Sequence, residues 1–412
     1  MMSRVLGTVL LSAALTAGCA GATRTPAGTP VSSPNVASSA SHQALASSSS
    51  ASSSASGPAT APSAPAVVRP TPSPPATPPP ATPSPVNPAT EGPATGDGLA
   101  RGTDEPADKE LALGDAAYEA EKYKEASAHF RKAGQLAPKD PAPKVGLVLV
   151  AVAEADLPLD YAAAPHDARI PGLLKQLDAA LKLDADFGPA LLERGHLLLI
   201  QGKAELASGT LERAAQLLPR HPEAQSAVGV ALLAVGKLNQ ALPYFERASA
   251  LERDNPDRLG NLGAAYLLQG RTADAVTAFE KAALLAPNNA RYQSDLGTAY
   301  LATNRLDRAL PALQRAVDLD PQRATYLANL SYALQLSPDL ARAVATAERA
   351  TQLDPKLGSA WLNLGTARAK RGELDQAEAA FKRAQTLDPE DPRVKANLEE
   401  LAELRRKKSG TP

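Results

Sequence analysis

A spacing of 34 residues runs through the second half of the chain and constrains its fold more than any other feature. Four prolines recur at this interval, and counting back by the same step from the first of them reaches Arg253 and then Pro219. Repeats of this length are too short to bury a core alone, so they stack on their neighbours. We assign position 32 of a repeat to Pro219, to Arg253 and to each of the four prolines. The four prolines are Pro287, Pro321, Pro355 and Pro389.

Positions 8, 20 and 27 of the repeat are always small. Small residues let two helices approach closely, while leucine and aromatic side chains between them fill the remaining space. Each repeat is therefore predicted to be a pair of antiparallel helices. Position 8 is Gly195, Gly229, Gly263, Gly297, Ser331 and Gly365, position 20 is alanine from Ala207 to Ala377, and position 27 is alanine from Ala214 to Ala384.

Position 15 lies between the two helices and holds residues that accept a left-handed backbone, Gly202, Gly236, Gly270, Asn304 and Gly372. One copy departs from this rule. There Ser337 is predicted to cap the second helix, with Pro338 at its first position. Pro243 and Pro311 fall inside predicted second helices, about one turn from the start, where a missing N–H costs little.

These residues resemble the signature of the tetratricopeptide repeat (TPR). The signature positions in the last copy are Trp361, Leu364, Gly365, Ala377, Phe381, Ala384 and Pro389. An N-terminal copy fits with Leu113, Gly114, Tyr123, Ala126, Phe130, Ala133 and Pro138. The resemblance implies an all-α fold, a right-handed superhelical solenoid of about eight helical hairpins closed by a capping helix.

Four regions are predicted. Residues 1–18 form a signal peptide, 19–106 a disordered tether, 107–391 the repeat array, and 392–412 a capping helix and tail. The second copy, 141–187, is longer than the others, and its excess is placed in a proline-containing loop at 156–171. The tether holds 18 of the 37 prolines and four charges before Ala100, so it cannot bury a core. Use of the tether as a proline-rich ligand is the alternative, but Arg69 is the only anchoring arginine near its proline-rich part.

The N-terminus carries a basic residue, a short apolar run from Val5 to Leu15, and small residues before Cys19. Eleven residues rise about 16 Å as a helix, which is too short for the roughly 30 Å hydrocarbon core. Leu15-Thr16-Ala17-Gly18-Cys19 resembles the lipobox of bacterial lipoproteins, which implies lipidation of Cys19 and anchoring in the bacterial cell envelope, facing the extracytoplasmic side. The alternative is an ordinary secretory signal with a chance cysteine.

Catalysis is not expected. The sequence holds no phosphate-binding glycine loop, nucleophile elbow or metalloprotease motif, and one cysteine cannot form an intramolecular disulfide. His166-Asp167 could be a base with its orienting group, but no nucleophile accompanies it. Cofactors, metals and a small-molecule substrate are not expected. A formal charge of −1 also disfavours nucleic acid as a partner.

Positions 2, 6, 9 and 13 share one side of each first helix, which lines the concave groove in TPR superhelices. Asparagine at position 6 can donate to and accept from a peptide backbone, as in the ladder that some TPR proteins use. The alternative is that these amides bond neighbouring helices. The candidate binding residues are Asn261, Asp295, Asn329 and Asn363 at position 6, Thr298, Tyr332 and Thr366 at position 9, and Arg291 at position 2.

The sequence thus predicts a membrane-tethered extracytoplasmic scaffold that binds protein or peptide partners, and assembly of envelope machinery is its expected role. Position 5 lacks lysine, so the TPR class that grips the C-terminal carboxylate of chaperones is not favoured. A glycan-binding or peptidoglycan-binding envelope module is the alternative. It requires aromatic platforms in the groove, where only Tyr332 is available among the candidate residues.

Overall fold

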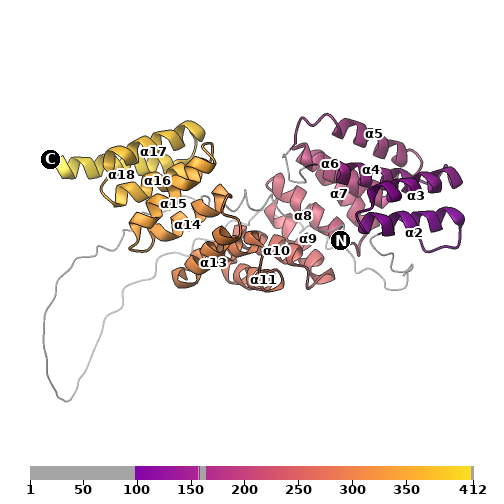
Figure 1. Ribbon diagram of the computed structural model, residues 1–412, viewed down its shortest axis with the longest axis horizontal. Helices are drawn as coiled ribbons and strands as arrows, with labels where there is room; N and C mark the ends of the chain where they lie inside the picture. Colours follow the sequence, from indigo (N-terminus) through magenta and orange to yellow (C-terminus); the bar gives the residue numbers. More distant parts are fainter. Residues whose placement is uncertain (1–97, 156, 158–163, 410–412) are drawn as a thin grey trace, which may run out of the picture. The chain divides into compact units, whose positions relative to one another are not determined.

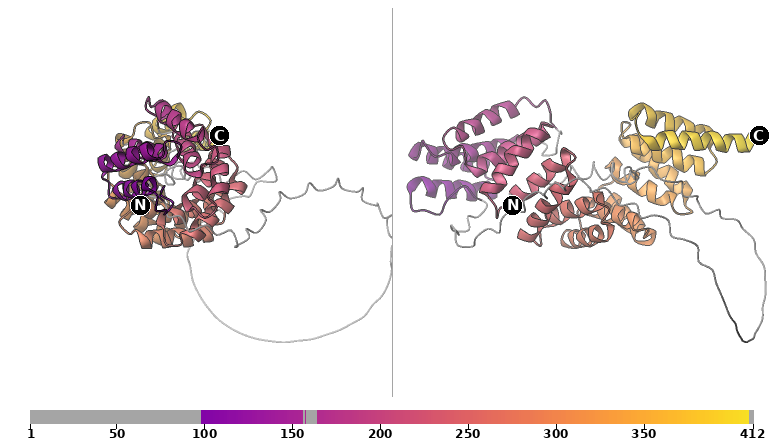
Figure 2. Two further views of the ribbon diagram at one scale, coloured as in Figure 1. Left: turned by 90° about the vertical axis from the view of Figure 1, so that its right-hand side faces the viewer. Right: turned by 180° about the vertical axis from the view of Figure 1, so that it is seen from behind.

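The computed structural model describes residues 98–155, 157 and 164–409, and within them it contains 17 helices and no strand. Signal peptide, lipobox and nearly all of the predicted tether lie outside the described residues. Helices α2 to α17 form eight pairs, and each helix contacts the next one along the chain (Figure 1). Figure 2 shows the same pairs from two further directions. The predicted solenoid of helical hairpins is confirmed.

The boundaries follow the 34-residue register. The first helices of the pairs are α2 (Pro106–Glu119), α4 (Ala142–Glu154), α6 (Gly188–Ile200), α8 (Pro222–Ala234), α10 (Pro256–Leu268), α12 (Ala290–Ala302), α14 (Ala324–Gln335) and α16 (Gly358–Lys370). The second helices are α3 (Tyr123–Leu136), α5 (Ile170–Leu181), α7 (Ala204–Leu217), α9 (Leu238–Leu251), α11 (Thr272–Leu285), α13 (Leu306–Leu319), α15 (Leu340–Leu353) and α17 (Leu374–Leu387). A final helix, α18 (Pro392–Ser409), follows the last pair.

Glycine at position 8 makes room for one large side chain of the partner helix. A Cβ atom on Gly365 would lie 2.5 Å from ring atoms of Phe381, and one on Gly195 would lie 2.3 Å from Leu211. Real Cβ atoms do not approach so closely, so the helices of a pair pack around this missing side chain. Phe381 and Leu211 are accordingly buried.

Gly195→Ala is expected to lower the free energy of unfolding by about 1–3 kcal/mol relative to Gly209→Ala, because the new methyl group overfills a packed contact. Gly209 is the matched control, since it lies on exposed helix α7 surface and its Cβ would meet nothing within 4 Å. Chemical denaturation with hydrogen exchange checks the prediction. Equal stabilities would contradict the packing argument, and exchange should quicken first around α6 and α7.

The turns within the pairs follow the prediction with one addition and one correction. Gly202 has φ 76° and Asn304 has φ 56°, and Glu121, which was not predicted, also lies in the left-handed region at φ 59°. In the exceptional copy Asp339, not Ser337, caps α15 by accepting from the Arg342 amide at 3.1 Å. Ser337 instead bonds backbone groups on either side of the turn.

Pro243 and Pro311 lie inside helices α9 and α13, as predicted, and both helices continue beyond them. Each proline is the sixth residue of its helix, just after the first turn. The chain omits one intrahelical bond at each position without ending the helix. The 34-residue register therefore overrides the local helix-breaking tendency of proline.

The described part of the chain begins at residue 98, ahead of the predicted start of the repeat array at 107. The Leu99 side chain is buried, and its amide donates to Asp115 Oδ2 at 2.7 Å. Arg101 donates two hydrogen bonds to Asp140, at 2.7 and 2.8 Å. Residues 98–105, assigned to the tether from composition, therefore pack against the first repeats because α2 and the α3–α4 turn offer carboxylates to them.

The insertion in the second copy and the final helix lie close to their predicted positions in the sequence. Within the segment predicted as a loop at 156–171, α5 already begins at Ile170, with Pro171 in its first turn. Helix α18 buries Val394 and Leu401 against the last pair. Arg405 of α18 pairs with Asp375 and Glu378 on α17. No helix in the described ranges is both long and apolar enough to cross a membrane.

Candidate functional site

A cavity of about 300 Å³ opens along the first helices α12, α14 and α16 and the final helix α18. Most of its lining comes from positions 2, 6 and 9 of the repeat, the positions predicted to face a groove. Six of the eight candidate groove residues line it, whereas Asn261 and Arg291 do not. The six are Asp295, Thr298, Asn329, Tyr332, Asn363 and Thr366.

The position-6 amides bond the preceding repeat at a constant separation of 35 residues. Asn261 Nδ2 donates to Ser226 Oγ at 3.1 Å, and Asn329 Nδ2 donates to Ser294 Oγ at 3.1 Å. The residue 35 positions before Asn363 is Ala328, which has no hydroxyl. Asn363 Nδ2 therefore donates to the Ala328 carbonyl oxygen, at 2.9 Å. These amides therefore tie neighbouring repeats together, as the alternative interpretation predicted.

The position-6 amides differ in which of their hydrogen-bonding groups remain available to a ligand. Asn261 is fully buried and does not line the cavity, so a ligand there does not reach it. Asn329 and Asn363 line the cavity, and each uses one of its two N–H groups on the neighbouring repeat. Since no described residue donates to their Oδ1 atoms, both can still accept a hydrogen bond.

Asp295 occupies position 6 between Asn261 and Asn329 but has no bond to the preceding repeat. Its partner position, 35 residues earlier, is Gly260, which has no side chain, and a carboxylate cannot donate to the glycine carbonyl. The side chain is only 7% exposed. Burial raises the pKa of this carboxyl group to about 6, although Arg291 one turn away opposes the rise.

The position-9 residues contribute two hydroxyls and one ring. Thr298 and Thr366 donate to carbonyl oxygens one turn earlier on their own helices, at 2.9 and 3.0 Å. The Thr366 hydroxyl also accepts from Asn397 Nδ2 at 3.4 Å. Tyr332 is 45% exposed, which makes it the large apolar side chain of the cavity that a ligand reaches most directly.

Arg291 is a structural residue and not part of the cavity lining. Its guanidinium lies 3.2 Å from Asp257 Oδ1 and 4.4 Å from the centre of the Tyr292 ring. The Tyr292 hydroxyl donates to the same Asp257 oxygen. Asp257, Arg291 and Tyr292 therefore join α10 to α12, and the predicted ligand-binding role of Arg291 has no support from its position.

A buried ion cluster occupies the equivalent positions of the preceding repeats. Arg258 is fully buried, with Nη2 2.6 Å from Glu223 Oε2 and Nε 2.9 Å from Glu252 Oε2. His196 lies 3.4 Å from Glu223 and 3.5 Å from Glu193. Glu193 and Glu223 raise the pKa of buried His196 to about 9, against the effect of burial. Arg258 and His196 lower the pKa of Glu223 to about 2, also against burial.

This cluster explains why the open cavity lies in the later repeats. Glu193, Glu223 and His196 take positions 6, 2 and 9, so the same face that lines the cavity from α12 onward carries mutually paired charges from α6 to α10. Paired and buried groups offer little to a partner. The later repeats hold asparagine, threonine and tyrosine at these positions and leave the space accessible.

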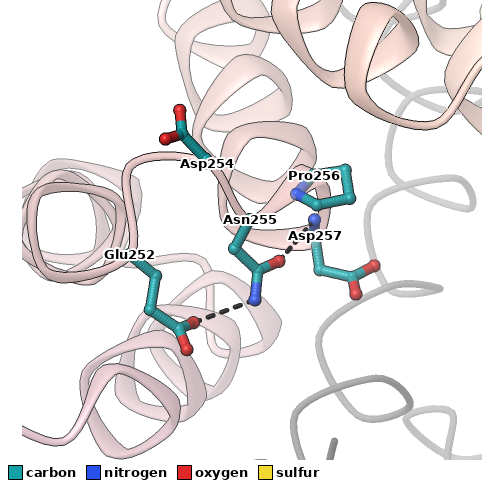
Figure 3. A pocket seen from close by; sticks show the side chains of 5 residues that line it. All are labelled: Glu252, Asp254, Asn255, Pro256 and Asp257. Atoms are coloured by element: carbon teal, nitrogen blue, oxygen red, sulfur yellow. Dashed lines mark hydrogen bonds between the residues drawn. The ribbon is translucent and has the colours of Figure 1, made fainter.

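A second hollow of about 380 Å³ lies at the junction of α9 and α10 and is lined by Glu252, Asp254, Asn255, Pro256 and Asp257 (Figure 3). Its acids already have partners. Asn255 caps α10 by accepting from the Asp257 amide and donates to Glu252, while Asp254 pairs with Lys281 at 3.0 Å. In the described part of the chain, no group of three or more potential metal ligands is present. We therefore place the candidate site in the first cavity.

The repeat pattern did not identify several of the residues that line the cavity. Arg393 and Asn397 are positions 2 and 6 of α18, and extending the 34-residue count by one copy would have found them. Tyr326 and Gln335 fall at positions 3 and 12, outside the face considered. Gln335 Nε2 donates to the Asn363 carbonyl at 3.0 Å, which links α14 to α16 at the cavity wall.

The comparisons with known proteins agree with the repeat register. A tetratricopeptide repeat model matches residues 232–294 and 267–334, and a second one matches residues 358–391. The first two ranges begin and end in first helices of the array, and the third spans the pair α16 and α17. The chain therefore contains tetratricopeptide repeats. No curated protein matches the sequence.

Solved structures share the fold at low sequence identity. The Cut9–Hcn1 hetero-tetramer of APC/C aligns with a TM-score of 0.55 at 14% identity, over 73% of this chain and 56% of that chain. This chain thus spans little more than half of that protein. PilF of Pseudomonas aeruginosa has a TM-score of 0.45 and 19% identity over 52% and 97% of the two chains. YrrB, a TPR protein with an unusual peptide-binding site, has a TM-score of 0.37 and 21% identity over 47% and 99%.

Proposed function

We propose that this tetratricopeptide-repeat chain is a scaffold that binds an extended segment of a partner protein in the cavity along α12, α14, α16 and α18. The observation that carries the proposal is the change of surface along one face of the array. Charges on this face are buried and paired up to α10, whereas from α12 onward hydrogen-bonding groups and an exposed ring surround accessible space. A TPR fold supports such a protein-binding role.

The chemistry of the cavity suits a peptide. Asn329 and Asn363 can accept from backbone N–H groups, and the apolar side chains of Leu301, Leu362 and Tyr332 line the same space. Extended segments present alternating backbone groups and side chains, so a lining that mixes acceptors with apolar surface can bind both. No reaction follows from these groups, because they include no paired nucleophile and base.

We further propose that Cys19 carries a lipid that anchors the chain to a bacterial membrane on its extracytoplasmic side, with the residues up to 97 as a tether. The support is the lipobox-like run before Cys19 and the low charge of the segment that follows. Assembly of envelope machinery is the process that such an anchored scaffold suits best.

A photo-reactive phenylalanine analogue at position 332, installed in the full chain in its own cells, tests the binding proposal. We expect irradiation to attach a polypeptide at this position, because the Tyr332 side chain is 45% exposed at the cavity. The matched control carries the analogue at Leu284, which is 79% exposed on second helix α11 and outside the cavity.

The attached species decides between the candidate partners. A polypeptide at position 332 that is missing at position 284 supports the proposal. Attachment of a polysaccharide or peptidoglycan fragment at position 332 would overturn it in favour of a glycan-binding module. Equal labelling at both positions would show that the cavity is not a preferred surface, which also contradicts the proposal.

A further inference from the structure

From α10 to α18, Asp295 is the one acid at position 6 among amides, and its surroundings give it no hydrogen-bond donor. Among the described residues, none donates a hydrogen bond to its carboxylate and no cation lies within ion-pair distance. Arg291, the cation of the described residues that acts on this carboxylate, lies one turn earlier and is engaged by Asp257 at 3.2 Å. Burying a carboxylate without compensation is costly, so proteins rarely retain one unless something else pairs with it.

The carboxylate is placed for a ligand. It is more than nine-tenths buried within the fold and yet lines the cavity, so a group that enters the cavity can reach it. An entering cation would meet a negative charge that water screens poorly. Leu301 and Tyr332 line the same cavity and offer apolar surface to the methylene stem of a long side chain.

We propose that Asp295 receives the ammonium or guanidinium group of a lysine or arginine side chain, so that the cavity selects extended peptide segments carrying a basic residue. This inference rests on the proposed function, because it assigns the chemistry of the segment bound there. Asn329 and Asn363 accept from the backbone of the segment, and Asp295 determines which side chain enters at the α12 end. A charge-assisted bond in a buried site gives both affinity and selectivity.

The buried carboxylate of Asp295 should lower the stability of the free protein. Because the pKa of Asp295 is about 6 in the folded chain and near 3.8 in an unfolded one, ionisation disfavours folding as the pH rises through this range. Asp295→Asn is then expected to stabilise the free protein above pH 6. A residue with a merely structural role would give the opposite result, since its replacement would destabilise the fold.

Affinity for a basic segment should rise with pH around the pKa of about 6, as the carboxyl group of the folded chain loses its proton. The charged and titratable groups nearest Asp295 are Arg291 on α12 itself and Tyr326 on α14. Arg393 of α18 lines the same cavity and pairs with Asp391 at 2.7 Å. From α10, Asp257 is held by Arg291 and the Tyr292 hydroxyl. Burial raises the pKa of Tyr326 further above its ordinary value, whereas it raises that of Asp295 to about 6, so the pH dependence in this range reports on Asp295.

The test selects peptides from a random displayed library on the immobilised full chain. The affinity of the selected peptides is then measured for the wild-type chain and for three variants. Asp295→Asn keeps the side-chain shape and installs the residue usual at position 6. Asp318→Asn removes an exposed charge from α13 as the matched control. Tyr332→Ala reports whether a peptide occupies the cavity. We expect selected peptides to share a lysine or arginine, and Asp295→Asn to weaken them roughly 10- to 100-fold while Asp318→Asn does not.

The outcomes separate this inference from the function on which it rests. Peptides that are weakened by Tyr332→Ala, but share no basic residue and bind Asp295→Asn unchanged, would overturn the role of Asp295 and leave peptide binding intact. Loss of stability in Asp295→Asn with unchanged affinity would do the same. If no selected peptide is sensitive to Tyr332→Ala, the proposed function fails and this inference fails with it.

Discussion

Arg258→Met is expected to lower the free energy of unfolding by about 3–5 kcal/mol, because it leaves the Glu223 carboxylate buried without its cation. The Arg258 side chain is fully buried between α8 and α10, and it pairs with Glu223 at 2.6 Å and with Glu252 at 2.9 Å. Methionine retains much of the packing volume but none of the charge. Denaturant unfolding, with hydrogen exchange across α8 to α10, measures the loss.

The matched control is Arg213→Met, which breaks a 2.9 Å pair with Asp186 in which both side chains are about half exposed. An exposed pair contributes at most about 1 kcal/mol, so this variant should be nearly neutral. Adding Glu223→Gln to Arg258→Met should recover part of the loss, since the uncompensated charge is then gone. Equal losses in the two arginine variants would contradict a stabilising role for the buried cluster.

The effect of Arg258→Met should also depend on pH in a defined direction. The pKa of Glu223 is lowered to about 2 in the folded chain, from an ordinary value of 4.5. The stability that its ionised form contributes is therefore present above pH 4.5 and is lost as the pH falls toward 2. The difference between wild type and Arg258→Met should shrink over that interval.

Cys19→Ser is expected to abolish fatty-acid labelling of the chain and to move it from the membrane fraction to the soluble fraction. Acyl chains contribute about 0.8 kcal/mol for each buried CH₂, so loss of the thiol removes essentially all of the anchoring energy. Metabolic labelling with a fatty acid and membrane fractionation measure both effects in the same cells.

The matched control is Ser12→Ala, which keeps both Cys19 and the apolar run. It should be labelled like the wild type. Persistent labelling of Cys19→Ser would contradict lipidation at this residue. Loss of labelling without release from the membrane would show that another part of the chain binds there, and would contradict the single-anchor proposal.

The sequence by itself determined the local architecture, and particular residues show why. Glycine at positions such as 195 and 365 leaves space for a partner side chain, and Gly202 or Asn304 accepts the left-handed turn that joins two helices. These are short-range requirements that recur every 34 residues, so repetition makes them readable. The same register placed six of eight groove candidates around one cavity, although it gave no test of what they bind.

Composition was a poorer guide to the edges of the fold. The segment from 98 to 105 has no apolar periodicity, and it was assigned to the tether. Its order comes from partners elsewhere in the chain, since Asp115 accepts from the Leu99 amide and Asp140 pairs with Arg101. Contacts of this kind depend on distant residues and leave no local pattern.

Only the tertiary structure decided which positions on the groove face remain available to a partner. Asn261 and Asp295 occupy the same repeat position, but Ser226 accepts a hydrogen bond from the first, whereas Gly260 offers the second no side chain. Arg258 fills the equivalent region one repeat earlier with a buried ion pair. The period determines where each side chain lies on its helix. The residue it meets, 35 positions earlier on the first helix of the preceding repeat, determines its burial and its charge.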